Sequence, residues 1–227
     1  MGLFNTKDTN DDNEAVFDFH FPTSKKAIII FVRNPELGTC KTRLAKTIGN
    51  EAALHIYKFL LQHTATVTAS LSADKYVFYS EKIKKNDLWD DAVFIKKLQT
   101  GANLGVRMEN AFIDLFQLGY QKVVIIGSDL LDLEPNHLNQ AFDKLNEYDV
   151  VIGPAKDGGY YLLGLSKPTA CLFQNKPWSE PRLLEVTLKE LSQKNVSFSL
   201  LEVLNDLDTF EDIKHYPQLK KFYTQHD

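Results

Sequence analysis

The sequence predicts a layered α/β domain with a mostly parallel central sheet and helices on both faces. Short continuous runs of apolar residues, such as AIIIFV at 27–32 and KVVIIG at 122–127, are typical of strands buried on both faces. Segments in which apolar residues recur at helical spacing alternate with these runs along the chain. This alternation is the pattern of a parallel sheet whose strands are joined by helices.

The expected strands and helices follow one another over most of the chain. Strands are expected at 27–32, 76–79, 93–98, 122–127, 149–153, 160–165 and 197–203. Helices are expected at 41–48, 51–71, 104–118, 135–146 and 181–193, with short helices after Thr209. Gly49 and Asn50 separate the first two helices, and Pro135 suits the first turn of a helix.

The start of the chain differs in composition from the rest. Its first residues are polar and rich in Asp, which predicts a tail without stable structure. Phe17, Phe19 and Phe21 then alternate with other residues, as side chains on one face of a strand do. We therefore expect an acidic tail and an aromatic arm at 1–24, and a single domain at 25–227.

Composition excludes several classes of protein. The 227 residues are 44% hydrophobic and carry a formal net charge of -4, so no broad basic surface for nucleic acid is expected. The longest apolar run is strand-sized, and the acidic first residues do not resemble a secretion signal. With Cys40 and Cys171 far apart and expected to be free thiols, a cytoplasmic protein without a membrane span is predicted.

In open α/β sheets, ligands bind beyond the carboxyl ends of the strands, so the loops after the strands are the candidate sites. The motif GTCKTRL begins at Gly38, after the first strand. Lys41 and Arg43 bring positive charge to a helix start, whose free N–H groups also attract anions. Thr39 and Thr42 can cap the helix or donate to a phosphate. The motif fits phosphate binding, although an ordinary helix start with solvated basic residues would also account for these residues.

The motif GSDLLDL follows the strand at 122–127. Asp129 lies just past the strand end, beside Ser128, so its carboxylate is expected in the cleft. Hard cations such as Mg²⁺ take oxygen ligands and bridge to substrate phosphates, which makes Asp129 a candidate metal ligand. The alternative is that Asp129 or Asp132 caps the next turn. We favour the metal for Asp129 and a structural role for Asp132.

A third glycine-rich loop lies between two expected strands. Asp157, Gly158, Gly159 and Tyr160 form the centre of the motif GPAKDGGYY. Asp-Gly is a common hairpin signal, so a plain turn explains the motif. Adjacent glycines also allow a sugar or a base to pack against the backbone, and the sequence leaves both interpretations open.

Two further loops add candidates. In QTGANLGVR, Gly101 precedes an expected helix and Arg107 is placed to reach a ligand. After the last strand, Asp206 and Asp208 can supply a second metal carboxylate. Asp208 can equally be a helix N-cap, with Glu211 completing a capping box.

Taken together, these segments resemble the DUF2064 family, whose members are described as glycosyltransferase-like. The resemblance runs from Lys25 to Tyr216. It rests on the motifs RNP at 33–35 with GTCKTRL, QTG at 99–101, GSD at 127–129, GPAKDGGYY at 153–161 and DLDT at 206–209. The resemblance implies the GT-A-like, Rossmann-like fold of the nucleotide-diphospho-sugar transferases, which guanylyltransferases of molybdenum cofactor and of 2-phospholactate share.

The resemblance also implies roles for individual residues. Lys41 and Arg43 match the residues that handle nucleotide phosphates, and Arg33 falls in a matching motif. Asp129 matches the metal-binding aspartate, with Asp206 or Asp208 as a second ligand for Mg²⁺ or Mn²⁺. The chain departs from the family at 130–131, where Leu-Leu replaces Cys-Pro.

The predicted function is a metal-dependent transferase that uses a nucleotide. An NDP-sugar donor is slightly favoured, and the alternatives are nucleotidyl transfer from an NTP and a non-catalytic nucleotide-binding module. The sequence leaves open which nucleotide, sugar and small-molecule acceptor take part, and whether the chain forms oligomers.

Overall fold

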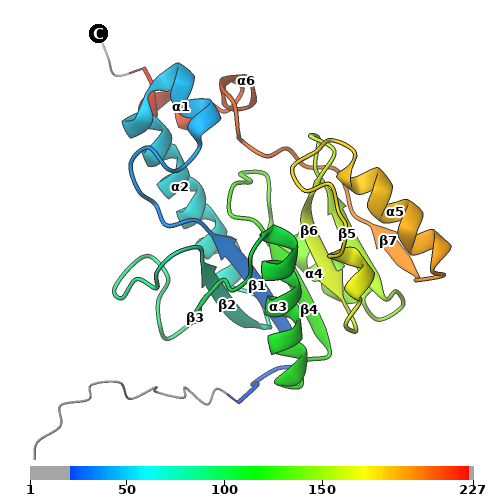
Figure 1. Cartoon of the computed structure of the whole chain (residues 1–227). Helices are drawn as coiled ribbons and strands as arrows, with labels where there is room; N and C mark the ends of the chain where they lie inside the picture. The colour runs from blue at the N-terminus through cyan, green and yellow to red at the C-terminus, as the bar shows by residue number, and fades with distance from the viewer. Residues whose placement is uncertain (1–20, 225–227) are drawn as a thin grey trace, which may run out of the picture.

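The computed structural model describes residues 21–224 and confirms the predicted α/β architecture, with helices on both faces of a seven-stranded sheet (Figure 1). The strands are β1 (Lys26–Val32), β2 (Asp74–Tyr79), β3 (Phe94–Leu98), β4 (Lys122–Ile126), β5 (Val150–Pro154), β6 (Tyr160–Leu165) and β7 (Phe198–Leu200). The helices are α1 (Thr42–Ile48), α2 (Asn50–Ala69), α3 (Leu104–Gln117), α4 (Pro135–Lys144), α5 (Leu183–Gln193) and α6 (Phe210–Ile213), with short 3₁₀ helices η1 (Ala170–Leu172) and η2 (Pro217–Phe222).

The strand order in the sheet is β3-β2-β1-β4-β6-β5-β7. β1 pairs in parallel with both β2 and β4, so that Ile30 lies opposite Val77 on one side and Ile126 on the other. β6 runs antiparallel to its neighbours β4 and β5, and the other pairs are parallel. The carboxyl ends of β1, β2, β3 and β4 therefore lie along one edge, which we call the carboxyl edge.

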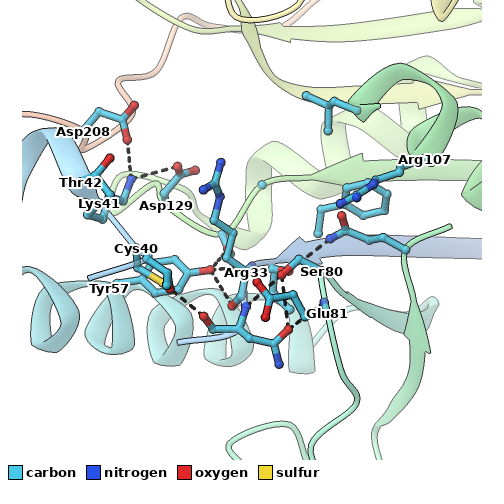
Figure 2. A pocket seen from close by; sticks show the side chains of 18 of the residues that line it. Arg33, Cys40, Lys41, Thr42, Tyr57, Ser80, Glu81, Arg107, Asp129 and Asp208 are labelled. Carbon is cyan, nitrogen blue, oxygen red and sulfur yellow. Dashed lines mark hydrogen bonds and ion pairs between the residues drawn. The ribbon is translucent and has the colours of Figure 1, made fainter. Parts of the chain in front are cut away.

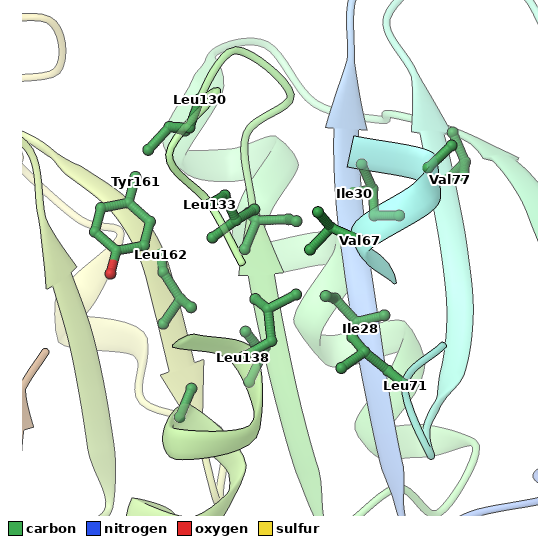
Figure 3. Close-up of a cluster of buried hydrophobic side chains, with 14 of the residues drawn as sticks. Ile28, Ile30, Val67, Leu71, Val77, Leu130, Leu133, Leu138, Tyr161 and Leu162 are labelled. Carbon is green, nitrogen blue, oxygen red and sulfur yellow. The ribbon is translucent and has the colours of Figure 1, made fainter. Parts of the chain in front are cut away.

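The alternation of side chains along the strands explains why both faces carry helices. Ile28 and Ile30 of β1 belong to a core cluster with residues of α2 and α4 (Figure 3). Ala27 and Ile29 point the other way and pack with residues of α3 and α5. All four side chains are fully buried, as expected for a strand that is apolar on both faces.

A third core cluster ties the end of the chain to the site. Leu44 of α1 and Ile56 of α2 pack with Leu207, Ile213 and Leu219. This packing returns the segment before α6 to the carboxyl edge, beside the loop that follows β1.

Several local predictions change in the structure. β7 ends at Leu200 rather than Val203. Thr209, not Asp208, caps α6, and its capping-box partner is Asp212 rather than Glu211. No side chain caps α1, so the capping roles considered for Thr39 and Thr42 are wrong.

Other predictions concern the chain ends and the membrane. Phe17 and Phe19 of the expected arm lie outside the described residues, and Phe21 is exposed. Within residues 21–224, no helix combines the length and apolar character needed to cross a bilayer. Cys40 and Cys171 are free, as predicted.

Candidate active site

A cavity of about 770 Å³ lies at the carboxyl edge, above β1 and β4. From β1 the chain continues to β2 on one side, whereas β4 lies on the other side. The loops after these two strands diverge at this point, which is where open α/β sheets bind ligands. The cavity volume is within the range of small-molecule sites.

Buried polar side chains hold the loop after β1 in place through hydrogen bonds. The Tyr57 hydroxyl accepts a hydrogen bond from the Arg33 N–H (2.9 Å) and donates to the Arg33 carbonyl (3.2 Å). Asn34, only 2% exposed, donates through Nδ2 to the Lys82 carbonyl (2.8 Å) and accepts from the Glu81 N–H (3.0 Å). The Cys40 thiol donates to the Asn34 carbonyl (3.3 Å). These bonds hold the loops after β1 and β2 together.

Lys41 is the central cation of the cavity (Figure 2). Its backbone adopts a left-handed conformation (φ 50°) just before α1. Its Nζ donates to Asp129 Oδ2 (2.9 Å) and Asp208 Oδ1 (2.8 Å), although the side chain is only 4% exposed. Burial disfavours the charged form, but the two carboxylates outweigh it and raise the pKa of Lys41 to about 12.

Asp208 links the end of the chain to this cation. It also pairs with Arg43, the other basic residue of the loop. Burial opposes its ionisation, but Lys41 and Arg43 outweigh burial and lower the pKa of Asp208. The Leu207 N–H donates to the Asp129 carbonyl (3.2 Å), so the two carboxylate-bearing segments are joined through their backbones.

Asp206 lies beside the cavity and is the least satisfied of the neighbouring carboxylates. Its Oδ1 is buried without a hydrogen-bond partner among the described residues. Burial and then the charges of Asp129 and Asp157 raise the pKa of Asp206 to about 8. A buried, unpaired oxygen near other carboxylates is a suitable ligand for a hard cation.

Asp129, Asp206 and Asp208 therefore have the chemistry of a magnesium or manganese site. In the described part of the chain, no three His, Cys, Asp or Glu side chains converge closely enough to enclose a cation. One or two carboxylates completed by substrate phosphates and water are nevertheless the usual arrangement for Mg²⁺. The residues thus fit a metal that is shared with a phosphorylated ligand.

The other end of the cavity lies beyond β2 and β3 and is lined by different residues. We call it the α3 end and define it by Ser80, Glu81, Gln99, Leu104 and Arg107. Opposite is the phosphate end, defined by Arg33, Lys41, Arg43, Asp129 and Asp208. In Figure 2, Arg107 and the group of Asp208, Lys41 and Asp129 lie at opposite sides of the view.

The structure brings most of the predicted residues together. Those that line the cavity are Arg33, Thr39, Lys41, Thr42, Arg43, Arg107, Ser128, Asp129 and Asp208. Those that do not line it are Gly38, Gly101, Asp157, Gly158, Gly159, Tyr160 and Asp206. Asp157 and Asp206 interact electrostatically with each other beside the cavity.

The glycines of the third loop have a packing role. At Gly158 (φ +89°), a Cβ atom would lie 1.9 Å from the Pro181 carbonyl oxygen. The Gly159 N–H donates to Asp157 Oδ1 (2.8 Å), which closes the turn between β5 and β6. The hairpin interpretation is therefore confirmed. Asp132 accepts a hydrogen bond from the Tyr216 hydroxyl, which is the structural role favoured for it.

Sequence reasoning missed several residues of the cavity. Tyr57 comes from the middle of α2, where its spacing among apolar residues is that of an ordinary core position. Asn34 and Gln99 lie in the motifs RNP and QTG, but their hydrogen bonds depend on strands that are distant in the sequence. A polar residue directly after a buried strand is the one signal that points to them.

Known proteins share this fold. A structure from Desulfovibrio desulfuricans G20, described only provisionally as a nucleotide-diphospho-sugar transferase, has a TM-score of 0.78 and 30% identity over 88% of this chain and 93% of that chain. The 2-phospho-L-lactate guanylyltransferase of Methanocaldococcus vulcanius is 23% identical over 194 residues, which cover 82% of each chain. A CMP:2-keto-3-deoxy-manno-octonic acid synthetase complexed with CTP has a TM-score of 0.52 at 11% identity, covering 87% of this chain and 99% of that chain, which shows the shared fold alone.

These similarities confirm the predicted fold, that of the nucleotide-diphospho-sugar transferases. They also confirm the predicted class of enzyme, a transferase. The family model described as "Uncharacterized protein conserved in bacteria (DUF2064)" matches residues 63–180, about half of the chain, and the chain belongs to this family.

Proposed function

We propose that the protein is a nucleotidyltransferase, which transfers a nucleoside monophosphate from an NTP to a phosphorylated acceptor and releases pyrophosphate. One observation carries the proposal: Lys41 is buried at the carboxyl edge between Asp129 and Asp208, with Arg43 beside it. Arg33 adds a third cation to the phosphate end. Three cations beside two carboxylates leave this end with a net positive charge, which suits a triphosphate and the charge that develops as pyrophosphate departs.

In the proposed reaction, an oxygen of the acceptor phosphate attacks the α-phosphorus. A new P–O bond forms, and the bond from the α-phosphorus to the bridging oxygen breaks, with its electron pair leaving on pyrophosphate. Lys41 and Arg43 are tethered to Asp208, so their donors are oriented before the substrate arrives. Arg33 neutralises phosphate oxygens from the end of β1. The protein's role is thus positioning and charge stabilisation.

A divalent metal fits this scheme. When bound, Mg²⁺ or Mn²⁺ polarises the phosphate oxygens and neutralises their charge. Asp129 and Asp208 would hold it together with substrate phosphates, and Asp206 supplies the unpaired oxygen nearby. The negative charges of Asp129 and Asp157 disfavour ionisation of Asp206, and a bound cation would offset this repulsion.

Glycosyl transfer from an NDP-sugar is the second candidate. The 30% identical relative, described as a nucleotide-diphospho-sugar transferase, favours it. The same metal and cations would then stabilise a departing nucleoside diphosphate. The 23% identical relative, a 2-phospho-L-lactate guanylyltransferase, favours nucleotidyl transfer, and for this reason we rank nucleotidyl transfer first.

The two reactions release different products, and this difference provides the test. Each NTP and each common NDP-sugar is incubated with Mg²⁺ or Mn²⁺ and a panel of phosphorylated hydroxy acids. Acceptor-stimulated release of pyrophosphate from an NTP supports the proposal, whereas release of a nucleoside diphosphate from an NDP-sugar supports glycosyl transfer. Metal-dependent nucleotide binding that Asp129→Asn abolishes, without any turnover, would instead indicate a non-catalytic module.

A further inference from the structure

The α3 end of the cavity differs from the phosphate end in which of its polar groups lack partners. At the phosphate end Lys41 pairs with both Asp129 and Asp208, whereas at the α3 end Glu81 and Gln99 keep acceptor oxygens without a partner among the described residues. If the proposed function is correct, the nucleobase lies at this end, and these acceptors select among bases.

Gln99 is fixed in one orientation by the ends of two strands. Its side-chain Nε2 lies 3.2 Å from the Val32 carbonyl oxygen and 2.9 Å from the Phe78 carbonyl oxygen. Carbonyl oxygens only accept hydrogen bonds, so the NH₂ group must face them. Gln99 lines the cavity, and its Oε1 has no partner in the described part of the chain and so remains an acceptor.

Glu81 presents an acceptor of a different kind. Its backbone is held in place because its N–H donates to Asn34 Oδ1 (3.0 Å). Its neighbour Lys82 pairs with Glu36 (2.9 Å), while the Glu81 carboxylate has no hydrogen-bond or ion-pair partner among residues 21–224. An ionised carboxylate can accept two parallel N–H donors.

Arg107 and Leu104 of α3 complete the α3 end. Arg107 Nε donates to the Gly101 carbonyl (3.0 Å), which fixes the plane of the guanidinium group. Its terminal nitrogens have no partner within the described residues and remain as donors. Leu104 is 44% exposed and provides an apolar surface at the cavity, against which the face of a base can pack.

We propose that this end recognises guanine, so that the nucleotide is a guanine nucleotide. Guanine alone among the common bases has two neighbouring N–H donors, N1–H and the 2-amino group, on one edge. A carboxylate such as Glu81 matches this pair, and Gln99 Oε1 provides a further acceptor. Guanine also has two adjacent acceptors, O6 and N7, which arginine binds in a bidentate manner. Adenine, cytosine and uracil each lack at least one of these features.

The test measures dissociation constants by titration calorimetry with Mg²⁺ for GTP, ITP, ATP, CTP and UTP. ITP keeps N1–H, O6 and N7 but lacks the 2-amino group. The variants are Glu81→Gln, Glu81→Ala and Arg107→Lys. The matched control is Glu147→Gln, because Glu147 is exposed and precedes β5 at the opposite edge of the sheet. Melting temperatures establish that each variant is folded.

The parent is expected to bind GTP about ten- to a hundredfold more tightly than ATP, CTP or UTP, with ITP between them. Glu81→Gln and Glu81→Ala should weaken GTP binding and bring the GTP-to-ITP ratio close to one. Arg107→Lys should weaken GTP and ITP equally, and Glu147→Gln should change neither.

Three results would overturn the inference. Tight metal-dependent binding of another nucleotide, or a guanine preference that both Glu81 variants retain, refutes guanine selection by this end and leaves nucleotide transfer intact. Absence of binding by every nucleotide refutes the proposed function together with this inference, so the two failures are distinguishable.

Discussion

Asp74 and Asp206 are carboxylates at opposite edges of the same sheet, and their surroundings differ sharply. Asp74 begins β2 and is 9% exposed. It accepts hydrogen bonds from the Thr23 N–H (2.8 Å), the Thr23 hydroxyl, the Ser24 N–H (3.3 Å) and the Tyr120 hydroxyl (2.6 Å). Asp206, at the carboxyl edge, has a buried oxygen without any partner among the described residues.

The pKa values of the two groups shift in opposite directions. Burial opposes the ionisation of Asp74, but its hydrogen bonds outweigh burial and lower the pKa. Burial and the neighbouring charges of Asp129 and Asp157 together raise the pKa of Asp206 to about 8. A satisfied carboxylate stabilises the fold, whereas an unsatisfied one beside like charges is a feature of sites that bind cations or substrates. The carboxylate at the amino ends of the strands thus stabilises the fold, whereas the one at the carboxyl edge is suited to binding.

The sharpest test of this contrast is Lys41→Met. We expect kcat/KM to fall at least about a hundredfold, because in the proposed reaction Lys41 stabilises the charge on the transferring phosphate. The loss of stability should be smaller, since Asp129 and Asp208 remain 33% and 32% exposed and can be solvated. Steady-state kinetics and thermal unfolding measure the two effects. Lys46→Met is the control, because Lys46 is exposed on α1, the helix that directly follows Lys41, and equal losses in both variants would contradict the role of Lys41.

Asp74→Asn should have the opposite profile. We expect the free energy of unfolding to fall by about 1–3 kcal/mol, because the amide cannot accept all of these hydrogen bonds. Since the folded pKa is lowered, the stabilisation by Asp74 is present above the unfolded pKa of about 3.8 and is lost as the pH falls through the folded pKa. Chemical denaturation at several pH values measures the effect, with Asp143→Asn on the exposed surface as the control. A loss of turnover per folded molecule would contradict the purely structural assignment.

Asp206→Asn should stabilise the metal-free protein. Since the folded pKa is raised to about 8, the contribution of Asp206 to stability is greatest below an unfolded pKa of about 3.8 and is lost as the pH rises through 8. In EDTA we therefore expect the variant to gain on the order of 1 kcal/mol over the parent at pH 8, and less at pH 5. Denaturation curves at both pH values provide the measurement. A variant that is less stable than the parent at pH 8 would show that Asp206 is satisfied by contacts like those of Asp74.

Tyr216→Phe should have the smallest effect on stability and activity. It tests the contrast between satisfied and unsatisfied carboxylates within the carboxyl edge. Asp132 is exposed there and accepts a hydrogen bond from Tyr216, so it resembles Asp74 rather than Asp206 in being satisfied. We expect a loss below about 0.5 kcal/mol and unchanged kinetics, as for an exposed interaction outside the site. A clear fall in kcat would mean that Asp132 acts in the site through Tyr216.

The sequence determined the architecture and the outline of the site. Strands such as β1 carry apolar side chains on both faces, and this pattern is local, so the alternation with helices could be read directly. Glycine and charged residues after β1 and β4 identified Lys41 and Asp129 for the same reason. Residues whose role depends on distant neighbours, such as Tyr57 beneath Arg33, could not be found this way.

Only the tertiary structure decided how the carboxylates divide their roles. Asp129 and Asp208 are 79 positions apart in the sequence, yet both contact Lys41, because Leu207 packs against α1 and α2 and returns the end of the chain to β4. The charged neighbours and the burial of each aspartate depend on how these distant segments pack together, not on the sequence around it. Four aspartates with similar local sequence signals therefore become an ion-pair partner of Lys41 (Asp208), a hydrogen-bond acceptor (Asp132), a turn residue (Asp157) and an unpaired buried acid (Asp206).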